Sequence, residues 1–148
     1  MKTIHSIAAL GASMFFGVAQ AGTITVSPER PLRISTGLFR CTLWNQGEGF
    51  PIDYTQAAQR VSAPISGNQA KCVFKDVQAG KYAISVLHDE DENKKMAVSD
   101  VGAPEEGFGF TNEAQPQNQQ TPSFESAAFQ YDGSNKEVQL MILYRRSE

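Results

Sequence analysis

Apolar residues alternate with polar ones along several short segments, and this period of two most restricts how the chain can fold. In the segment LFRCTLW, Phe39, Cys41 and Leu43 fall on one face while Arg40 and Thr42 fall on the other. Successive side chains of a strand point to opposite faces, so this pattern predicts a strand buried on one side. No stretch shows a sustained helical period.

The same alternation predicts further strands, bounded by turns rich in Gly, Asn and Asp. The clearest are AKCVFK, KYAISVLH and EVQLMILY, and the weaker ones are 32–36, 61–65 and 127–131. We expect TITV, residues 23–26, to be an edge strand, because Pro28 and Pro31 follow it. Short strands with such turns predict an all-β, antiparallel two-sheet sandwich with one long loop excursion from 89 to 122.

The N-terminus is typical of a secretory signal peptide. Lys2 precedes an apolar run, and Ala19-Gln20-Ala21 fits the small-x-small cleavage rule. We therefore expect a signal peptide over 1–21 and a single domain over 22–148, located in the periplasm or outside the cell. The alternatives are a retained anchor or a first core strand. The run is too short to span a bilayer, which needs about 20 residues.

The charge balance narrows the range of partners. The net charge is −3 at pH 7 and there is no basic cluster, so nucleic acid is a poor partner. No later apolar run is long enough to span a membrane. A small ligand or another protein of the cell envelope remains as the expected partner.

The two cysteines, Cys41 and Cys72, both fall on the apolar faces of predicted strands. Export beyond the reducing cytosol permits a disulfide between them, which we expect in the core. The alternative is a pair of free, buried thiols. A catalytic thiol is disfavoured, because the only histidine beyond the signal peptide is His88 and no second partner is evident.

The segment HDEDENKKMAVSD has oxygen-bearing residues at alternate positions, as calcium loops do. Counting from Asp89, loop positions 1, 3, 5, 7 and 12 are occupied by Asp89, Asp91, Asn93, Lys95 (through its carbonyl) and Asp100. This set is a candidate calcium site, and the alternative is a solvated acidic turn. Any binding should be weak, with a dissociation constant of roughly 0.1–1 mM as in extracellular modules.

Two positions of this segment count against calcium. Lys94 stands at position 6, where the tight turn favours Gly, and Ala97 at position 9 offers no side-chain oxygen. His88 precedes the segment and could act as a general base or metal ligand. Alternatively, it closes the edge of the core and bonds to nearby backbone.

A second unusual segment, GAPEEGFGFTN, occupies residues 102–112. Phe108 and Phe110 could anchor it on the sandwich as an ordinary loop. Alternatively, Glu106 and Asn112 turn toward the end of the strand at 81–88 and complete one polar site there. The predicted binding set is His88, Asp89, Glu106, Phe108, Phe110 and Asn112.

The blocks FKDVQAGKYAISVLHDEDENKKM, GAPEEGFGFTNEAQ and PSFESAAFQY resemble a family of small secreted bacterial proteins grouped as domain of unknown function 2141. The resemblance extends from about residue 37 to 144. It implies an immunoglobulin-like or transthyretin-like sandwich and no established activity. It also implies that the signature polar residues are His88, Asp89, Glu106 and Asn112. At positions 94 and 97 the chain has Lys and Ala where the family pattern has Gly and Asp.

Three hypotheses of function follow. The leading hypothesis is a secreted, non-enzymatic module that binds a ligand, a metal or a partner through the face built by residues 88–112, because sandwiches present such loops on a rigid scaffold. The alternative is a small hydrolase-like enzyme with His88 as base and Asp89 or Glu106 as its partner. A purely structural envelope protein is a third hypothesis.

Overall fold

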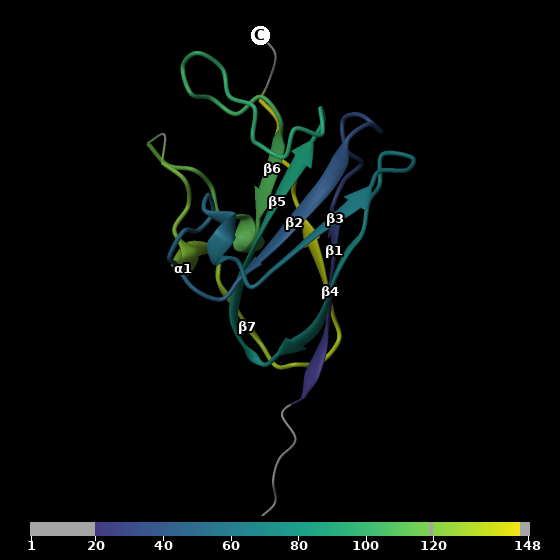
Figure 1. The fold of residues 1–148 in the computed structure, drawn as a ribbon, viewed down its shortest axis with the longest axis vertical. Coiled ribbons are helices and arrows are strands. Elements are labelled where there is room, and N and C mark those ends of the chain that lie inside the picture. Colours follow the sequence, from purple (N-terminus) through teal and green to yellow (C-terminus); the bar gives the residue numbers. More distant parts are fainter. Residues whose placement is uncertain (1–19, 119, 146–148) are drawn as a thin grey trace, which may run out of the picture.

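The computed structural model describes residues 20–118 and 120–145, so most of the expected signal peptide lies outside the described residues. The chain forms two open β-sheets packed together, which confirms the predicted all-β sandwich (Figure 1). The strands are β1 (Ala21–Pro28), β2 (Leu38–Trp44), β3 (Gln59–Pro64), β4 (Cys72–Gln78), β5 (Gly80–Asp89), β6 (Gly107–Phe110), β7 (Phe129–Tyr131) and β8 (Lys136–Leu140). The short helical turns are η1 (Tyr54–Gln56), η2 (Thr111–Glu113) and α1 (Phe124–Ala127). No helix among these residues is long and apolar enough to cross a membrane.

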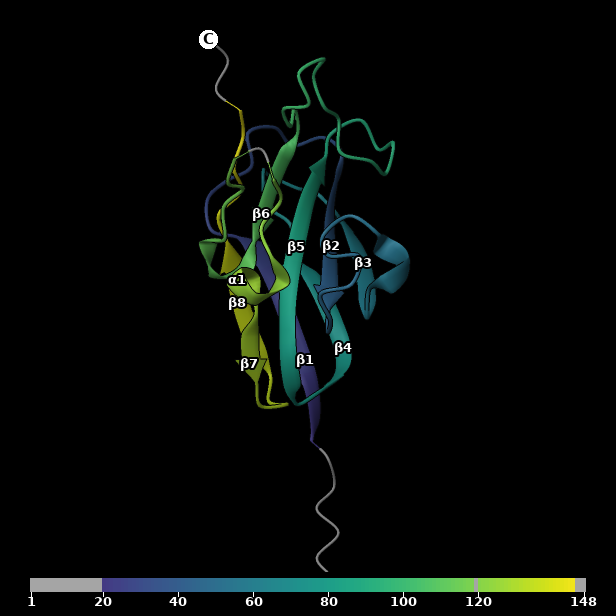
Figure 2. The ribbon, with the colours of Figure 1, turned by 90° about the vertical axis from the view of Figure 1, so that its left-hand side faces the viewer.

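The smaller sheet has the order β4-β1-β8 and the larger one the order β3-β2-β5-β6, with β7 also paired to β5 (Figure 2). The expectation that residues 23–26 form an edge strand is wrong, because β1 is the central strand of the smaller sheet. It pairs antiparallel with β4 and parallel with β8, so the sandwich contains one parallel pair. Ile24 and Val26 are fully buried, and Pro28 ends the strand, where its missing N–H does little harm.

The predicted disulfide between Cys41 and Cys72 is present, and it joins the two sheets. Cys41 lies on β2 and Cys72 on β4, with their Cα atoms 6.4 Å apart. Both residues are buried in the main core, with Phe39, Leu43 and Phe74 as buried neighbours in the same cluster. The alternating apolar faces of the two strands therefore meet across this bond.

Three predicted elements differ from the observed ones. Residues 32–36 form no strand, and β8 ends at Leu140 rather than at residue 144. The long connection from 89 to 122 contains a strand, β6, which extends the larger sheet. The segment that follows β8 pairs with the edge of β6 that faces away from β5, and a Cβ at Gly107 would overlap the ring of Tyr144. Two backbone bonds between Phe108 and Leu143, of 3.1 and 2.7 Å, fix this contact.

Candidate functional site

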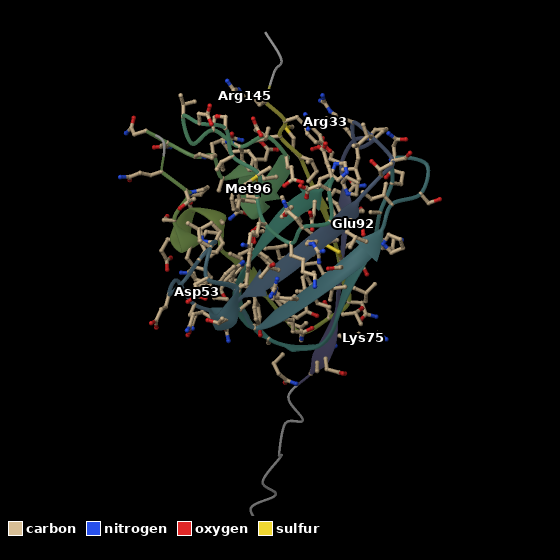
Figure 3. All side chains as sticks on the ribbon, turned by 45° about the horizontal axis from the view of Figure 1, so that its top comes forward. Arg33, Asp53, Lys75, Glu92, Met96 and Arg145 are labelled. Atoms are coloured by element: carbon tan, nitrogen blue, oxygen red, sulfur yellow. A yellow bond between two sulfur atoms is a disulfide. The ribbon has the colours of Figure 1, made fainter. Side chains whose placement is uncertain are left out.

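The predicted site residues lie at one end of the sandwich. The loops that follow β5 and precede β6 gather there, at the end opposite the start of β1 (Figure 1). Figure 3 turns this end toward the viewer, with Glu92, Met96 and Arg33 labelled on it. His88 and Asp89 are the last residues of β5, so strand alternation sends their side chains to opposite faces of the larger sheet.

His88 faces the core and is fully buried. Its Nε2 lies 2.9 Å from the carbonyl oxygen of Thr36, and its Nδ1 lies 2.7 Å from the hydroxyl of Tyr144. A carbonyl can only accept, so Nε2 carries the proton, and in the neutral ring Nδ1 accepts from Tyr144. Both ring nitrogens are therefore engaged within the fold, and neither is placed to act as a base toward a ligand.

Asp89 faces the other side of the sheet and is also fully buried. Its Oδ2 forms an ion pair with Nε of Arg40 on the neighbouring strand β2, and accepts the backbone N–H of Lys94 at 3.0 Å. Its Oδ1 is buried and has no hydrogen-bond partner within residues 20–118 and 120–145. Leaving a buried acceptor unsatisfied costs about 1–3 kcal/mol. A hydrogen-bond donor or a cation bound next to Oδ1 would remove this cost.

Glu106 closes the loop that Asp89 begins. Its carboxylate is 4% exposed and accepts two backbone N–H groups, from Glu90 at 2.7 Å and from Ala97 at 3.0 Å. It makes no hydrogen bond to His88 or Asp89 among the described residues. Instead, carboxylate oxygens of Asp89, Asp91 and Glu106 lie within 4.8 Å of one another. We call these three residues the acidic pocket.

The other predicted calcium ligands are not members of this carboxylate cluster. Asn93 donates from its backbone and side-chain nitrogens to Asp91, at 3.1 and 2.8 Å, and its own Oδ1 accepts the N–H of Lys95 at 2.8 Å. Asp100 is exposed at the turn of a separate hairpin, closed by a bridge between Val98 and Pro104. Calcium-loop spacing therefore indicated two of the three clustered carboxylates, and the third, Glu106, belongs to the polar site predicted from the second segment.

The tight turn after Asp91 is made without glycine. Glu92 and Lys94 both adopt left-handed backbone conformations, with φ of 60° and 68°. Such conformations cost a residue with a side chain roughly 1–2 kcal/mol. Lys94 is the position at which the sequence lacked the expected Gly, and the chain makes the turn there nonetheless.

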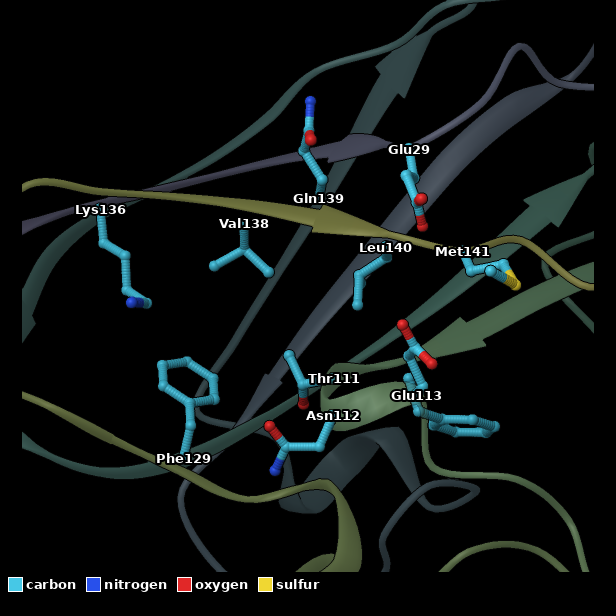
Figure 4. A pocket seen from close by; sticks show the side chains of 11 residues that line it. Glu29, Thr111, Asn112, Glu113, Phe129, Lys136, Val138, Gln139, Leu140 and Met141 are labelled. Atoms are coloured by element: carbon cyan, nitrogen blue, oxygen red, sulfur yellow. The ribbon is translucent and has the colours of Figure 1, made fainter.

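The remaining predicted residues separate into two places. Phe108 and Phe110 lie on the outer face of β6, paired in register with Leu87 and Ser85 of β5. Asn112 follows the far end of β6 and donates to the carbonyl of Ala128 at 2.6 Å, away from His88 and Asp89. It lines a small pocket of about 320 Å³ with side chains from β7 and β8 (Figure 4).

Arg40 is the site residue that sequence reasoning missed. It appeared only as a polar residue on the outer face of a predicted strand, a position usually occupied by solvated charges. Its pairing with Asp89 depends on the register that places β2 beside β5, with Leu38 opposite Asp89. The residues around Arg40 in the sequence do not indicate how β2 aligns with β5, so the pairing could not be predicted.

Comparison with known proteins places this arrangement in a family. One family model, described as "Uncharacterized protein conserved in bacteria (DUF2141)", matches residues 30–139. The chain belongs to this family. The match includes Arg40 and all three carboxylates of the acidic pocket, so the candidate site lies within the part shared with other DUF2141 proteins. No curated protein and no solved structure matches the chain.

Proposed function

We propose that this protein is a secreted, non-enzymatic binding module that holds a calcium ion in its acidic pocket. The observation that carries the proposal is the Oδ1 atom of Asp89, which is buried beside two further carboxylates and lacks a hydrogen-bond partner among the described residues. A cation in the pocket would satisfy this oxygen and offset the repulsion among the three carboxylates. We further propose that residues 1–21 direct export and are removed, which leaves the module in the periplasm or outside the cell.

The geometry of the acidic pocket fits the ion. Calcium binds oxygens at 2.3–2.6 Å, so two ligands on opposite sides of the ion are roughly 5 Å apart. Oxygens of Asp89, Asp91 and Glu106 that lie within 4.8 Å of one another can therefore share one ion. Each carboxylate has about four lone-pair positions, so bonds to backbone N–H groups do not exhaust its capacity.

The same geometry predicts weak affinity. Calcium takes six to eight oxygens, so water and backbone carbonyls must supply part of its shell. Arg40 already neutralises part of the charge on Asp89. We therefore expect a dissociation constant of roughly 0.1–1 mM, the range of extracellular modules, which suits a compartment where calcium is abundant.

Isothermal titration of residues 22–148 with calcium, and with magnesium for comparison, tests the proposal. Asp91→Asn removes one pocket charge from an exposed side chain, so the fold should survive. Asp100→Asn makes the same change on the neighbouring hairpin and is the matched control. We expect one calcium site, weakened about tenfold by Asp91→Asn and unchanged by Asp100→Asn. An absence of calcium binding, or an equal loss in both variants, would contradict the proposal.

A further inference from the structure

A cleft of about 1420 Å³ lies over the outer face of the larger sheet. Its floor is formed by outward-facing side chains of the four strands β3, β2, β5 and β6. Its walls come from the segments 51–55 and 94–104 and from residues near Thr121. Asp53 and Met96, which belong to two different walls, are labelled in Figure 3. None of the three carboxylates of the acidic pocket lines it, so this is a second site.

The rim of the cleft is unusually apolar for a surface. Ile52, Val98 and Val101 line it and are 70%, 56% and 79% exposed. Among the described residues, one other large hydrophobic side chain is exposed, Ile34, at 38%. Apolar side chains gathered at the mouth of a cavity mark a surface that binds an apolar partner.

The charged side chains of the cleft are mostly basic, although the chain as a whole has a net charge of −3. Arg40, Arg60, Lys94 and Lys95 line it, against the single carboxylate of Asp53 among its described lining. Arg40 is paired with Asp89, but no ion pair is formed by the other three within the described part of the chain. The guanidinium of Arg60 lies 4.6 Å from the ring centre of Tyr54, which holds it at the cleft wall.

We propose that this cleft binds a small amphipathic carboxylate with a single acyl chain. The chain lies along Phe108 and the aliphatic rim, and the basic lining of the cleft, which includes Arg60, Lys94 and Lys95, attracts the carboxylate. A peptide fits less well, because the floor is the pleated face of a sheet and offers side chains rather than unpaired backbone groups. The proposal does not depend on calcium, and its test is carried out in the presence of chelator so that either proposal can fail alone.

The test is titration of residues 22–148 with dodecanoate, followed by calorimetry and by the fluorescence of Trp44, the only tryptophan. Trp44 reports on the cleft because its indole donates to Oγ of Ser85, at 2.9 Å, and Ser85 lines the cleft. Dodecyltrimethylammonium carries the same chain with the opposite charge, and acetate carries the charge without the chain. We expect saturable binding of dodecanoate, at least tenfold weaker binding of the ammonium compound, and no binding of acetate.

Variants at exposed positions distinguish binding in the cleft from non-specific binding of the amphiphile elsewhere on the surface. Lys95→Gln and Arg60→Gln should each weaken dodecanoate binding three- to tenfold. Lys75→Gln removes an exposed lysine on β4, outside the cleft, and should leave binding unchanged. Equal binding of the two amphiphiles, no saturation by dodecanoate, binding of an acidic peptide in its place, or an equal loss in Lys75→Gln would each overturn the proposal. Unchanged melting temperatures confirm that the variants are folded.

Discussion

Removal of the disulfide should lower stability by an amount that follows from its place in the chain. Cys41 and Cys72 are 31 residues apart. In the chain-entropy model, closing a loop of this size stabilises the folded state by about 3.7 kcal/mol at 25 °C. A chain of this length loses roughly 4 °C of melting temperature per kcal/mol, so the double variant Cys41→Ala/Cys72→Ala should melt about 14 °C lower. The lost sulfur–sulfur packing in the core adds to this value.

Denaturant unfolding and thermal melting of residues 22–148 measure the effect. The oxidised protein should lose stability when reductant is added, while the double variant should not respond to reductant. Cys41→Val/Cys72→Val, which fills more of the space, separates the packing contribution from that of the cross-link. A loss below about 1 kcal/mol on reduction would refute the reasoning, because it would mean that the cross-link hardly restricts the unfolded chain.

Three further predictions concern buried polar groups. Arg40→Met leaves the buried carboxylate of Asp89 without its cation and should lower the free energy of unfolding by about 3 kcal/mol in chelator. Calcium should then raise the melting temperature of this variant more than that of the unmodified protein. Arg60→Met is the control and should change neither the stability nor the response to calcium by much. Tyr144→Phe removes the hydroxyl bonded to His88 and should cost about 1–2 kcal/mol in a denaturant melt; no loss would show that the bond is not formed in solution. Burial, aided by the charge of Asp132, raises the pKa of Tyr131 above its ordinary 10.0, so this residue's contribution to stability is fully present below about pH 10 and is lost as the pH rises through the folded-state pKa. Tyr131→Phe should flatten that alkaline loss in urea melts, and an unchanged slope would contradict the assignment.

Much of the fold could be predicted from alternation, because the apolar faces that the sequence indicated on β2, β4 and β5 all lie in the main core. The failures arose where tertiary contacts decide the structure. The segment GFGF was expected to be part of a loop anchored by Phe108 and Phe110. Its glycines have low strand propensity, yet pairing with β5 makes it a strand. Residues 141–144 alternate like a strand, but they pair with the edge of β6 through an isolated bridge instead of extending β8.

The candidate site was predicted only in part, because tertiary contacts decide which side chains meet there. The alternate spacing predicted that Asp89 and Asp91 lie together, and the segment 102–112 was expected to bring Glu106 to the same end of the sandwich. The three carboxylates do lie together in the structure. Asp100 was included because of its position in the calcium-loop pattern. The acidic loop ends at Ala97, whose backbone N–H donates to the carboxylate of Glu106. Asp100 comes after this point and lies on a separate hairpin. Asn112 was expected at the site, but β6 runs away from it and carries Asn112 to the far end.

A calcium-linked melting curve would report binding at only modest size. With a dissociation constant of about 1 mM, calcium at about 10 mM stabilises the folded state by about 1.4 kcal/mol. That free energy corresponds to a rise of roughly 5 °C for a chain of this length. It would not identify the ligands of the ion.

The most direct test of the calcium proposal is a crystal structure of residues 22–148 grown in calcium, with anomalous scattering to locate the ion. We predict one peak at the end of β5, with oxygens of Asp89, Asp91 and Glu106 each about 2.3–2.6 Å from it. An ordered acidic pocket without a peak, or a peak bound by Asp100 instead, would contradict the proposal.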